Sequence, residues 1–270
     1  AHVKATSRKI SGLSESEITR SDFERAFLSS YGEEVGQTIL SQYRMVKPIG
    51  TLISECFYKG MLETGRGTSK PYFTSLPLSL GREVNWVDTS DASEKSYEKK
   101  PTNNGNNGYS YFNSYEIGVI EDLLQQLSSN VEFFEQIKAD AGDNPAIGVI
   151  CMYAEQKRAM LRAYNSIPWL RSMIDGGVLK IDTVDSYQGK ENKVIIISLV
   201  RSNSQGTEGF LKSEQRINVA ISRAQERVYL VGNSEMWRES NVGSPLGRVR
   251  GYIDSDFNGT AFISSNSLRD

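Results

Sequence analysis

Cysteine and histidine are nearly missing from this chain of 270 residues, which contains two cysteines, Cys56 and Cys151, and one histidine, His2. Two cysteines cannot build a framework of several disulfides, and one added histidine does not complete a four-ligand zinc site. This scarcity excludes the disulfide-rich secreted class and the zinc-finger class. It favours a reducing compartment, so we expect an intracellular protein, cytoplasmic or nuclear.

Long hydrophobic runs and a strong charge of one sign are also lacking. The longest apolar run, Val194–Val200, has seven residues and contains Ser198, whereas a membrane-spanning helix needs about 20. No apolar signal segment is present at the N-terminus, and we expect no membrane partner. With 31 Lys and Arg against 33 Asp and Glu, contact with nucleic acid requires a local basic stripe.

Short apolar runs alternate with helical patterns along most of the chain, which is typical of a parallel sheet with helices on both faces. We therefore predict an α/β fold. The run Val194–Val200 is apolar on both faces, as expected of a central strand. The expected strands are Glu83–Val87, Ile147–Met152, Val178–Thr183, Val194–Val200 and Arg227–Val231.

Two helices are expected between these strands. Asn113–Leu127 begins with the capping pattern Asn113-x-x-Glu116 and then repeats apolar residues at helical spacing. A second helix begins near Glu155 and carries Lys157, Arg158 and Arg162 on its outer side. That basic face could meet phosphates or could simply be solvated.

Three further stretches do not fit the alternation. Residues 1–36, with the amphipathic segment Phe23–Leu28, form no complete sheet-and-helix unit and resemble the tail of a preceding domain. A short strand is expected at Thr38–Leu40. Within the main domain, 37–237, the polar stretch 89–110 is expected to be a surface excursion. The segment 238–270 reads as an extension of unknown role, with a hairpin at Asp254–Phe262.

Gln42-Tyr43-Arg44-Met45 is the first segment with potential chemistry, and Phe57-Tyr58-Lys59-Gly60 follows one helix later. By itself this is equally consistent with a surface turn.

The second segment, Asp182–Glu191, is a polar turn between two apolar strands, where open α/β sheets hold ligands. Gly189 lets the backbone approach a phosphate or sugar, and the hydroxyls of Thr183 and Ser186 suit a nucleic-acid backbone. A turn stabilised by its own side chains explains this segment equally well.

The third segment is Arg216–Ala224. On one helix, Arg216, Ala220 and Arg223 would share a face, about 10 Å from end to end. A guanidinium on a rigid helix can aim two N–H groups at phosphate oxygens, although salt bridging to the surface is a common alternative.

A phosphate-binding loop of the form Gly-x-x-x-x-Gly-Lys-[Ser/Thr] does not occur in the chain. Gly189-Lys190 is followed by Glu191 and fails the pattern, and no acidic strand end is placed to hold Mg²⁺. A self-sufficient ATPase of that type is therefore not expected.

In this order and spacing the three segments resemble the second, C-terminal RecA-like domain of up-frameshift-like superfamily 1 helicases. The resemblance rests on Gln-Tyr-Arg-Met with a downstream Phe-Tyr-x-Gly, then Val-Asp-x-Tyr-Gln-Gly-x-Glu, then Asn-Val-Ala-x-Ser-Arg-Ala, and it covers Asp22–Trp237. It implies a RecA-like fold of the P-loop-hydrolase type without its own phosphate loop.

By this resemblance, ATP with Mg²⁺ binds between two RecA-like domains, and the first domain supplies the metal ligands. The resemblance implies catalytic arginine fingers at Arg44 and Arg223. Tyr43 would pack on the adenine, Glu191 would approach the ribose or phosphates, and single-stranded RNA or DNA would lie across the domain. The remaining implied residues are Gln42, Gln188 and Gly189 for the nucleotide and Tyr153, Thr183 and Ser186 for the strand.

The resemblance thus predicts the C-terminal motor domain of an ATP-dependent helicase or translocase, inactive in ATP hydrolysis without its N-terminal RecA-like partner domain. Two alternatives remain: a non-catalytic helicase-like module that binds nucleic acid or protein, and a plain interaction domain on the same scaffold. Nothing in the chain indicates the oligomeric state.

Overall fold

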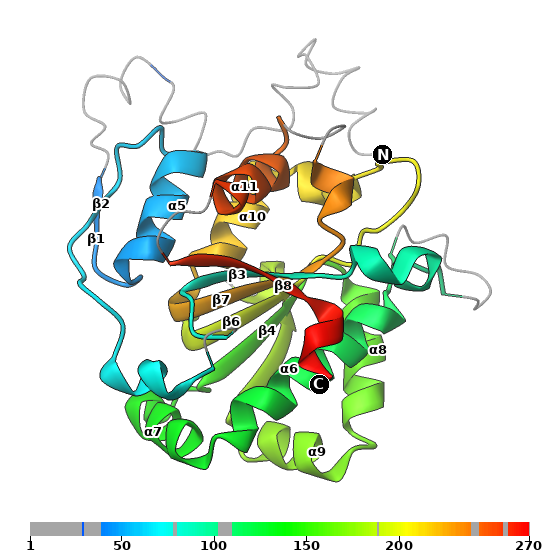
Figure 1. The fold of residues 1–270 in the computed structure, drawn as a ribbon, viewed down its shortest axis with the longest axis horizontal. Coiled ribbons are helices and arrows are strands. Elements are labelled where there is room, and N and C mark those ends of the chain that lie inside the picture. The colour runs from blue at the N-terminus through cyan, green and yellow to red at the C-terminus, as the bar shows by residue number, and fades with distance from the viewer. Residues whose placement is uncertain are drawn as a thin grey trace. The chain divides into compact units, whose positions relative to one another are not determined.

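The computed structural model describes residues 29, 39–77, 80–101, 110–187, 189–238, 243–255 and 259–269. The chain divides into two compact units, Ala1–Leu40 and Ser41–Asp270, and every element described below belongs to the second unit (Figure 1). The predicted segment Phe23–Leu28 and the side chain of Gln188 lie outside the described residues.

A six-stranded sheet with the order β5-β4-β6-β7-β3-β8 forms the centre of this unit, and all its neighbouring strands run parallel. The predicted α/β class is therefore confirmed. The strands are β3 (Val84–Asp88), β4 (Ile147–Cys151), β5 (Leu179–Thr183), β6 (Asn192–Ser198), β7 (Ala224–Gly232) and β8 (Thr260–Ser264).

Helices cover both faces of the sheet (Figure 1). On one face lie α5 (Lys47–Phe57), α10 (Glu214–Ile221) and α11 (Pro245–Asp254). On the other lie α6 (Ser114–Ser129), α7 (Val131–Ala141), α8 (Ala154–Tyr164) and α9 (Pro168–Asp175).

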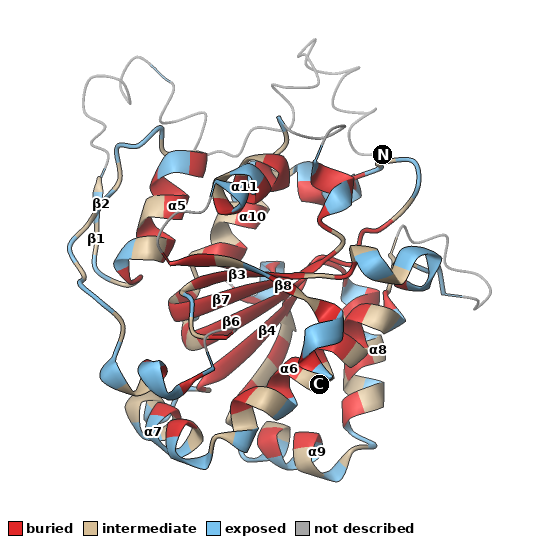
Figure 2. Ribbon diagram, in the orientation of Figure 1, coloured by how far each residue is buried: buried red, intermediate tan, exposed pale blue. Residues whose placement is uncertain are grey.

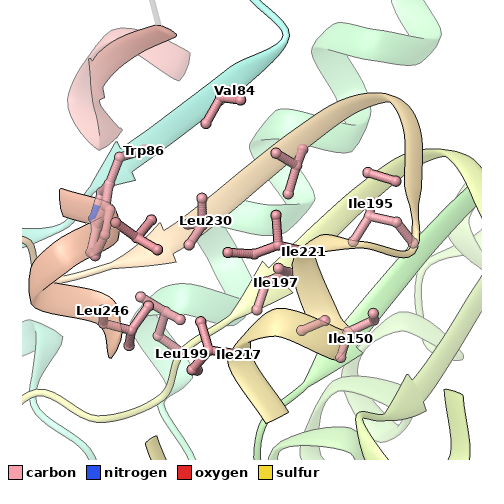
Figure 3. Close-up of a cluster of buried hydrophobic side chains, with 14 of the residues drawn as sticks. Val84, Trp86, Ile150, Ile195, Ile197, Leu199, Ile217, Ile221, Leu230 and Leu246 are labelled. Atoms are coloured by element: carbon pink, nitrogen blue, oxygen red, sulfur yellow. The ribbon is translucent and has the colours of Figure 1, made fainter. Parts of the chain in front are cut away.

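The central strand β6 is apolar on both faces because each face supplies one core. Ile195 and Ile197 point to the core under α5, α10 and α11, whereas Val194 and Ile196 point to the core over α6. Figure 3 shows the first core, where strand residues meet helical residues such as Ile217. The strands are accordingly the most buried part of the molecule (Figure 2).

Asn113 caps α6 as its sequence pattern predicts, since its side chain accepts hydrogen bonds from the N–H groups of Tyr115 and Glu116. The Glu116 half of the pattern differs. Its carboxylate turns into the core and accepts hydrogen bonds from Ser198 Oγ at 2.6 Å and from the N–H of Val200 at 2.9 Å. Burial raises the pKa of Glu116 to about 8, although these two hydrogen bonds act in the opposite direction.

Several expected elements are wrong or shifted. The short strand lies at Ser41–Gln42 (β1), not at Thr38–Leu40, and pairs in parallel with Glu63–Thr64 (β2). The expected hairpin at 254–262 is wrong, because α11 ends at Asp254 and β8 pairs in parallel with β3.

Sequence periodicity could not reveal β8, because this edge strand has only five residues and its hydrogen-bond partner, β3, is distant in the sequence. The sheet thus extends beyond Trp237. In the polar stretch 89–110, a 3-10 helix spans Ser90–Ser96 and buries Ser96, while 102–109 lies outside the described residues.

Candidate functional site

Arg44 lies in a turn that follows β1 and that the side chain of Gln42 holds in shape. Gln42 Oε1 accepts the N–H groups of Arg44 at 2.9 Å and Met45 at 2.8 Å. Gln42 Nε2 donates to the carbonyl of Met45 and to Thr64 Oγ1 on β2. The predicted nucleotide residue Gln42 therefore shapes the turn that presents Arg44.

The guanidinium of Arg44 joins three distant segments. Its Nε forms an ion pair with the carboxylate of Glu191, and its Nη1 donates to the carbonyl of Ser222 at 3.2 Å. The other carboxylate oxygen of Glu191 accepts from Gln225 Nε2 at 2.7 Å. Two predicted site residues that lie 147 positions apart, Arg44 and Glu191, are thus in direct contact.

Arg223 lies beside this group, but not on a helix as predicted. Helix α10 ends at Ile221, and Arg223 occupies the turn before β7, while Ala224 begins that strand. Arg223 Nε donates to the carbonyl of Val219 at 3.1 Å, and Nη1 donates to the carbonyl of Lys190 at 3.3 Å. Helix α10 is shorter than predicted, because strand β7 begins several residues before the apolar run from which it was predicted.

Arg223 lies close enough to Arg44 and Glu191 for both charges to act on it. Partial burial lowers the pKa of Arg223, the positive charge of Arg44 lowers it further, and Glu191 opposes both. Within the described part of the chain, Arg223 has carbonyl partners and no ion pair with a carboxylate. Arg44, Arg223 and Glu191 are here called the arginine cluster. Its two positive charges face one negative charge, so one positive charge is left without a counter-charge within the cluster.

Tyr43 is 74% exposed. Its ring lies against the backbone of Gly65, where a Cβ atom would come within 2.2 Å of the ring. Gly65 also donates its N–H to the carbonyl of Gln42 at 2.9 Å. The turn thus presents a flat aromatic surface next to the arginine cluster.

The segment from Thr183 to Glu191 crosses one face of the sheet. Thr183 is paired with Cys151 at the carboxyl end of β4, whereas Val194 is paired with Ile147 at its amino end. The buried Tyr187 holds the segment down, and its hydroxyl donates to Asn192 Oδ1 at 2.6 Å. Gly189 has a φ of +81°, in the left-handed region that favours glycine.

Gly148 on β4 leaves the space that Tyr187 fills. A Cβ atom at Gly148 would lie 2.1 Å from the Tyr187 hydroxyl, so we expect Gly148→Ala to displace Tyr187 and destabilise the fold by about 1–3 kcal/mol. A matched control is Gly251→Ala on the exposed side of α11, where nothing lies within 4 Å of the added atom. This change is expected to stabilise the fold by about 0.5–1 kcal/mol. Urea unfolding of both variants measures the difference, and equal midpoints would contradict the assignment.

Thr183 and Ser186, which the resemblance implies for the nucleic-acid strand, lie at the carboxyl edge of the sheet. Thr183 Oγ1 donates to Ser186 Oγ at 3.1 Å, and Thr183 is half-buried whereas Ser186 is exposed. Neighbouring Asp182 pairs with Lys157 of α8 at 2.7 Å. Partial burial raises the pKa of Asp182, but hydrogen bonds from Lys157 and the N–H of Thr183 outweigh it and lower the pKa. The basic face of α8 is thus partly committed to internal ion pairs.

The resemblance implies that Tyr153 faces the single strand, but Tyr153 is only 3% exposed. Its hydroxyl accepts the N–H of Phe210 at 3.2 Å, and its ring lies 5.4 Å from the Phe210 ring and 5.8 Å from the Tyr111 ring. Tyr153 therefore supports the loop above it, and Phe210 takes the exposed place.

Residues 18–235 match the protein family described as an AAA domain. The human DNA replication ATP-dependent helicase/nuclease DNA2 is 32% identical over 229 residues, which cover 80% of this chain and 20% of that protein. Helicase SEN1 of Saccharomyces cerevisiae is 28% identical over 209 residues, which cover 73% of this chain and 8% of that protein. The chain belongs to the up-frameshift-like superfamily 1 helicases.

This helicase chain spans a small part of such relatives, between 5% and 21% of their length. Among solved structures, the C-terminal domain of a "possible DNA helicase" from Lactobacillus plantarum has a TM-score of 0.37 at 12% identity, with 71% of this chain and 88% of that one covered. The six-stranded parallel sheet with helices on both faces, together with the family match, confirms the RecA-like fold.

Helicases of this family use ATP with Mg²⁺. The positive excess of the arginine cluster fits the phosphate groups of a nucleotide. No cluster of three His, Cys, Asp or Glu side chains that could hold a metal ion occurs in the parts of the chain that the structure describes. Nor is any helix in those parts long and apolar enough to cross a membrane.

Arg66 and Glu226 support the turn that carries Arg44, and no sequence pattern indicated either residue. Arg66 Nη1 donates to the carbonyls of Arg44 at 2.6 Å and Gln225 at 3.1 Å, and its Nη2 pairs with the fully buried Glu226. The pair is separated by 160 positions, and neither residue belongs to a recognisable motif. Local spacing could not have found it.

Proposed function

We propose that this chain is the second RecA-like motor domain of an ATP-dependent helicase or translocase that acts on single-stranded RNA or DNA. In this proposal ATP and its Mg²⁺ bind between this domain and an N-terminal RecA-like domain that holds the phosphate loop and the metal ligands. The chain without that domain does not hydrolyse ATP.

The observation that carries the proposal is the arginine cluster. In the sequence, most of the strands and helices of the core lie between Arg44 and Arg223. In the structure, both arginines approach Glu191 at the amino ends of β6 and β7. Two guanidinium groups beside one carboxylate leave an excess of positive charge that a bound anion would neutralise. A nucleotide phosphate is the anion that this family supplies.

In the assembled cleft, Arg223 and Arg44 act as arginine fingers on the γ-phosphoryl group. Its equatorial oxygens carry the charge in the transition state, and a planar guanidinium can contact two of them at once. Glu191 holds Arg44 in place and approaches the ribose or phosphate side. Tyr43 offers its exposed ring to the adenine, and the backbone at Gly189 approaches the nucleotide. Gln188 belongs to the same proposed nucleotide contacts and lies outside the described residues.

The single-stranded nucleic acid occupies the opposite edge of the sheet, at the carboxyl ends of the β-strands. Thr183 and Ser186 contact its sugar–phosphate backbone there, and hydroxyl contacts of this kind do not read sequence. Tyr153 acts from beneath by supporting the loop that carries Phe210. The segment 183–191 and helix α10 each run from this edge to the arginine cluster. They therefore supply a direct mechanical link between strand and nucleotide.

The domain organisation follows from this role. Residues 1–36 are the end of the first RecA-like domain or the segment between domains, and 37–237 form the second domain. Strand β8 adds the edge strand of the sheet, and helix α11 packs on one of its faces. The protein works inside the cell, where its nucleic-acid substrates and ATP are found.

Strand-stimulated ATP turnover tests the proposal. The gene product extended to include its N-terminal domain is compared with the 270-residue chain at equal concentration, with and without a single-stranded oligonucleotide. We expect turnover in the extended protein that rises with the oligonucleotide, and none from the chain alone. Absence of turnover in the extended protein would instead indicate a helicase-like binding module.

A further inference from the structure

Phe210 and Arg216 form an exposed pair at the carboxyl edge of the sheet. Phe210 is 48% exposed, and the Arg216 guanidinium lies over its ring, 5.1 Å from the centroid. The two residues come from the 3-10 helix Gly209–Lys212 and the first turn of α10. The next residue, Leu211, is buried in the core, so this short helix packs Leu211 inward and turns Phe210 outward.

The ring is held rigidly. The N–H of Phe210 donates to the Tyr153 hydroxyl, and the Tyr153 ring supports the Phe210 ring from 5.4 Å. Gly209, with a φ of +60°, lets the backbone come down onto Tyr153, since a Cβ atom there would lie 2.4 Å from the hydroxyl. Because the ring is fixed before any ligand arrives, little side-chain entropy is lost on binding.

The plane of the Arg216 guanidinium is also fixed, and its positive charge is already paired with the carboxylate of Asp185. Nε and Nη2 donate to the two oxygens of Asp185 at 3.2 and 3.1 Å. A guanidinium committed in this way is a poor clamp for a phosphate, but it keeps a flat, partly exposed face. Such faces, like aromatic rings, stack with unpaired bases.

Asp185 connects the pair to the hydroxyls of the proposed strand path, because it lies between Thr183 and Ser186 in the chain. Hydroxyls for the sugar–phosphate backbone and a stacking surface for a base are therefore adjacent. This is the combination used to hold single strands without reading their sequence.

We propose that Phe210 and Arg216 form a base-stacking platform that holds one unpaired base of the single strand. The inference rests on the proposed function, since it assigns a base contact within that strand path. The platform accepts any of the bases, because each has an aromatic face.

The test measures binding of the 270-residue chain to two fluorescein-labelled 12-mers by anisotropy, one with bases and one made of abasic sites. We expect Phe210→Ala to weaken binding of the base-bearing strand about tenfold and to leave the abasic strand unchanged. Phe210→Trp keeps an aromatic face and is expected to restore binding. The matched control is Phe262→Ala, since Phe262 is 38% exposed and lies under Arg250, 5.5 Å from the guanidinium carbon, but on β8.

Each outcome decides between the two proposals. Equal loss on both strands, an equal loss in Phe262→Ala, or no loss in Phe210→Ala overturns the platform while leaving strand binding in place. Failure of the parent chain to bind either strand removes the strand path itself, and the platform with it. Circular dichroism of each variant confirms that the fold is retained.

Discussion

Replacing Arg223 with alanine is expected to lower strand-stimulated ATP turnover of the domain-extended protein by about 10³-fold or more, with nucleotide binding retained. An arginine finger acts mainly on charge that develops in the transition state, and its loss typically costs about 10³ to 10⁵ in rate. The native contacts of Arg223 in the described chain are hydrogen bonds to two backbone carbonyls. Removing Arg223 therefore leaves no buried charged group without a partner, and we expect the fold to be retained.

The measurement pairs steady-state turnover with binding of a fluorescent ATP analogue. Arg223→Lys keeps the charge but not the planar fork, and it is expected to recover only a small part of the rate. Arg171→Ala serves as the control, because Arg171 lies on the exposed surface of α9 and pairs only with Asp175 there. An Arg223→Ala protein with unchanged turnover would remove Arg223 from the catalytic assignment.

Replacing Arg66 with methionine is expected to destabilise the domain by about 3–5 kcal/mol. The change leaves Glu226, which is fully buried, without its charged partner, and an unpaired buried carboxylate is among the costliest defects in a protein interior. The carbonyl of Arg44 also loses its donor. The turn that presents Arg44 should loosen at the same time.

The pair can be dissected by a double substitution. Arg66→Met with Glu226→Gln removes the charge but keeps an acceptor for the N–H of Lys70, and it is expected to recover most of the lost stability. Arg171→Met breaks an exposed pair and should change stability by no more than about 1 kcal/mol. Urea unfolding gives all three values, and a small loss in Arg66→Met would show that water reaches Glu226.

Replacement of Arg223 and replacement of Arg66 have different consequences for the site. Arg223 is expected to affect turnover without affecting stability, and Arg66 is expected to affect stability first. If Arg66→Met also lowers turnover after correction for the folded fraction, the cause is the position of Arg44. Rescue by the Glu226→Gln double variant would then separate folding from positioning.

Much of the fold could be predicted because its signals are local. Five of the six sheet strands were predicted within a few residues, since an apolar run between turns has the same appearance wherever it lies in the chain. Asn113 was identified as the cap of α6 for the same reason. The exceptions were β8 and the true end of α10, where hydrogen bonds to a distant strand decide the element.

The candidate site was predictable in part. The motif order indicated Arg44, Glu191 and Arg223, and the structure brings them together. The same reasoning placed Tyr153 at the surface, where the structure buries it under Phe210. An aromatic residue at a strand end reads the same whether it points out or supports a loop.

The sequence by itself determined the α/β class, the central position of β6, the capped start of α6 and the order of three motifs typical of helicases. The first three depend on neighbours in the chain, and each motif is itself a short run, although the motifs together extend from Gln42 to Ala224. Only the tertiary structure decided that Glu191 holds Arg44, that Glu226 holds Arg66, and that segment 183–191 joins two edges of the sheet. These contacts span up to 160 positions, and they depend on the strand order β5-β4-β6-β7-β3-β8, which no local pattern encodes.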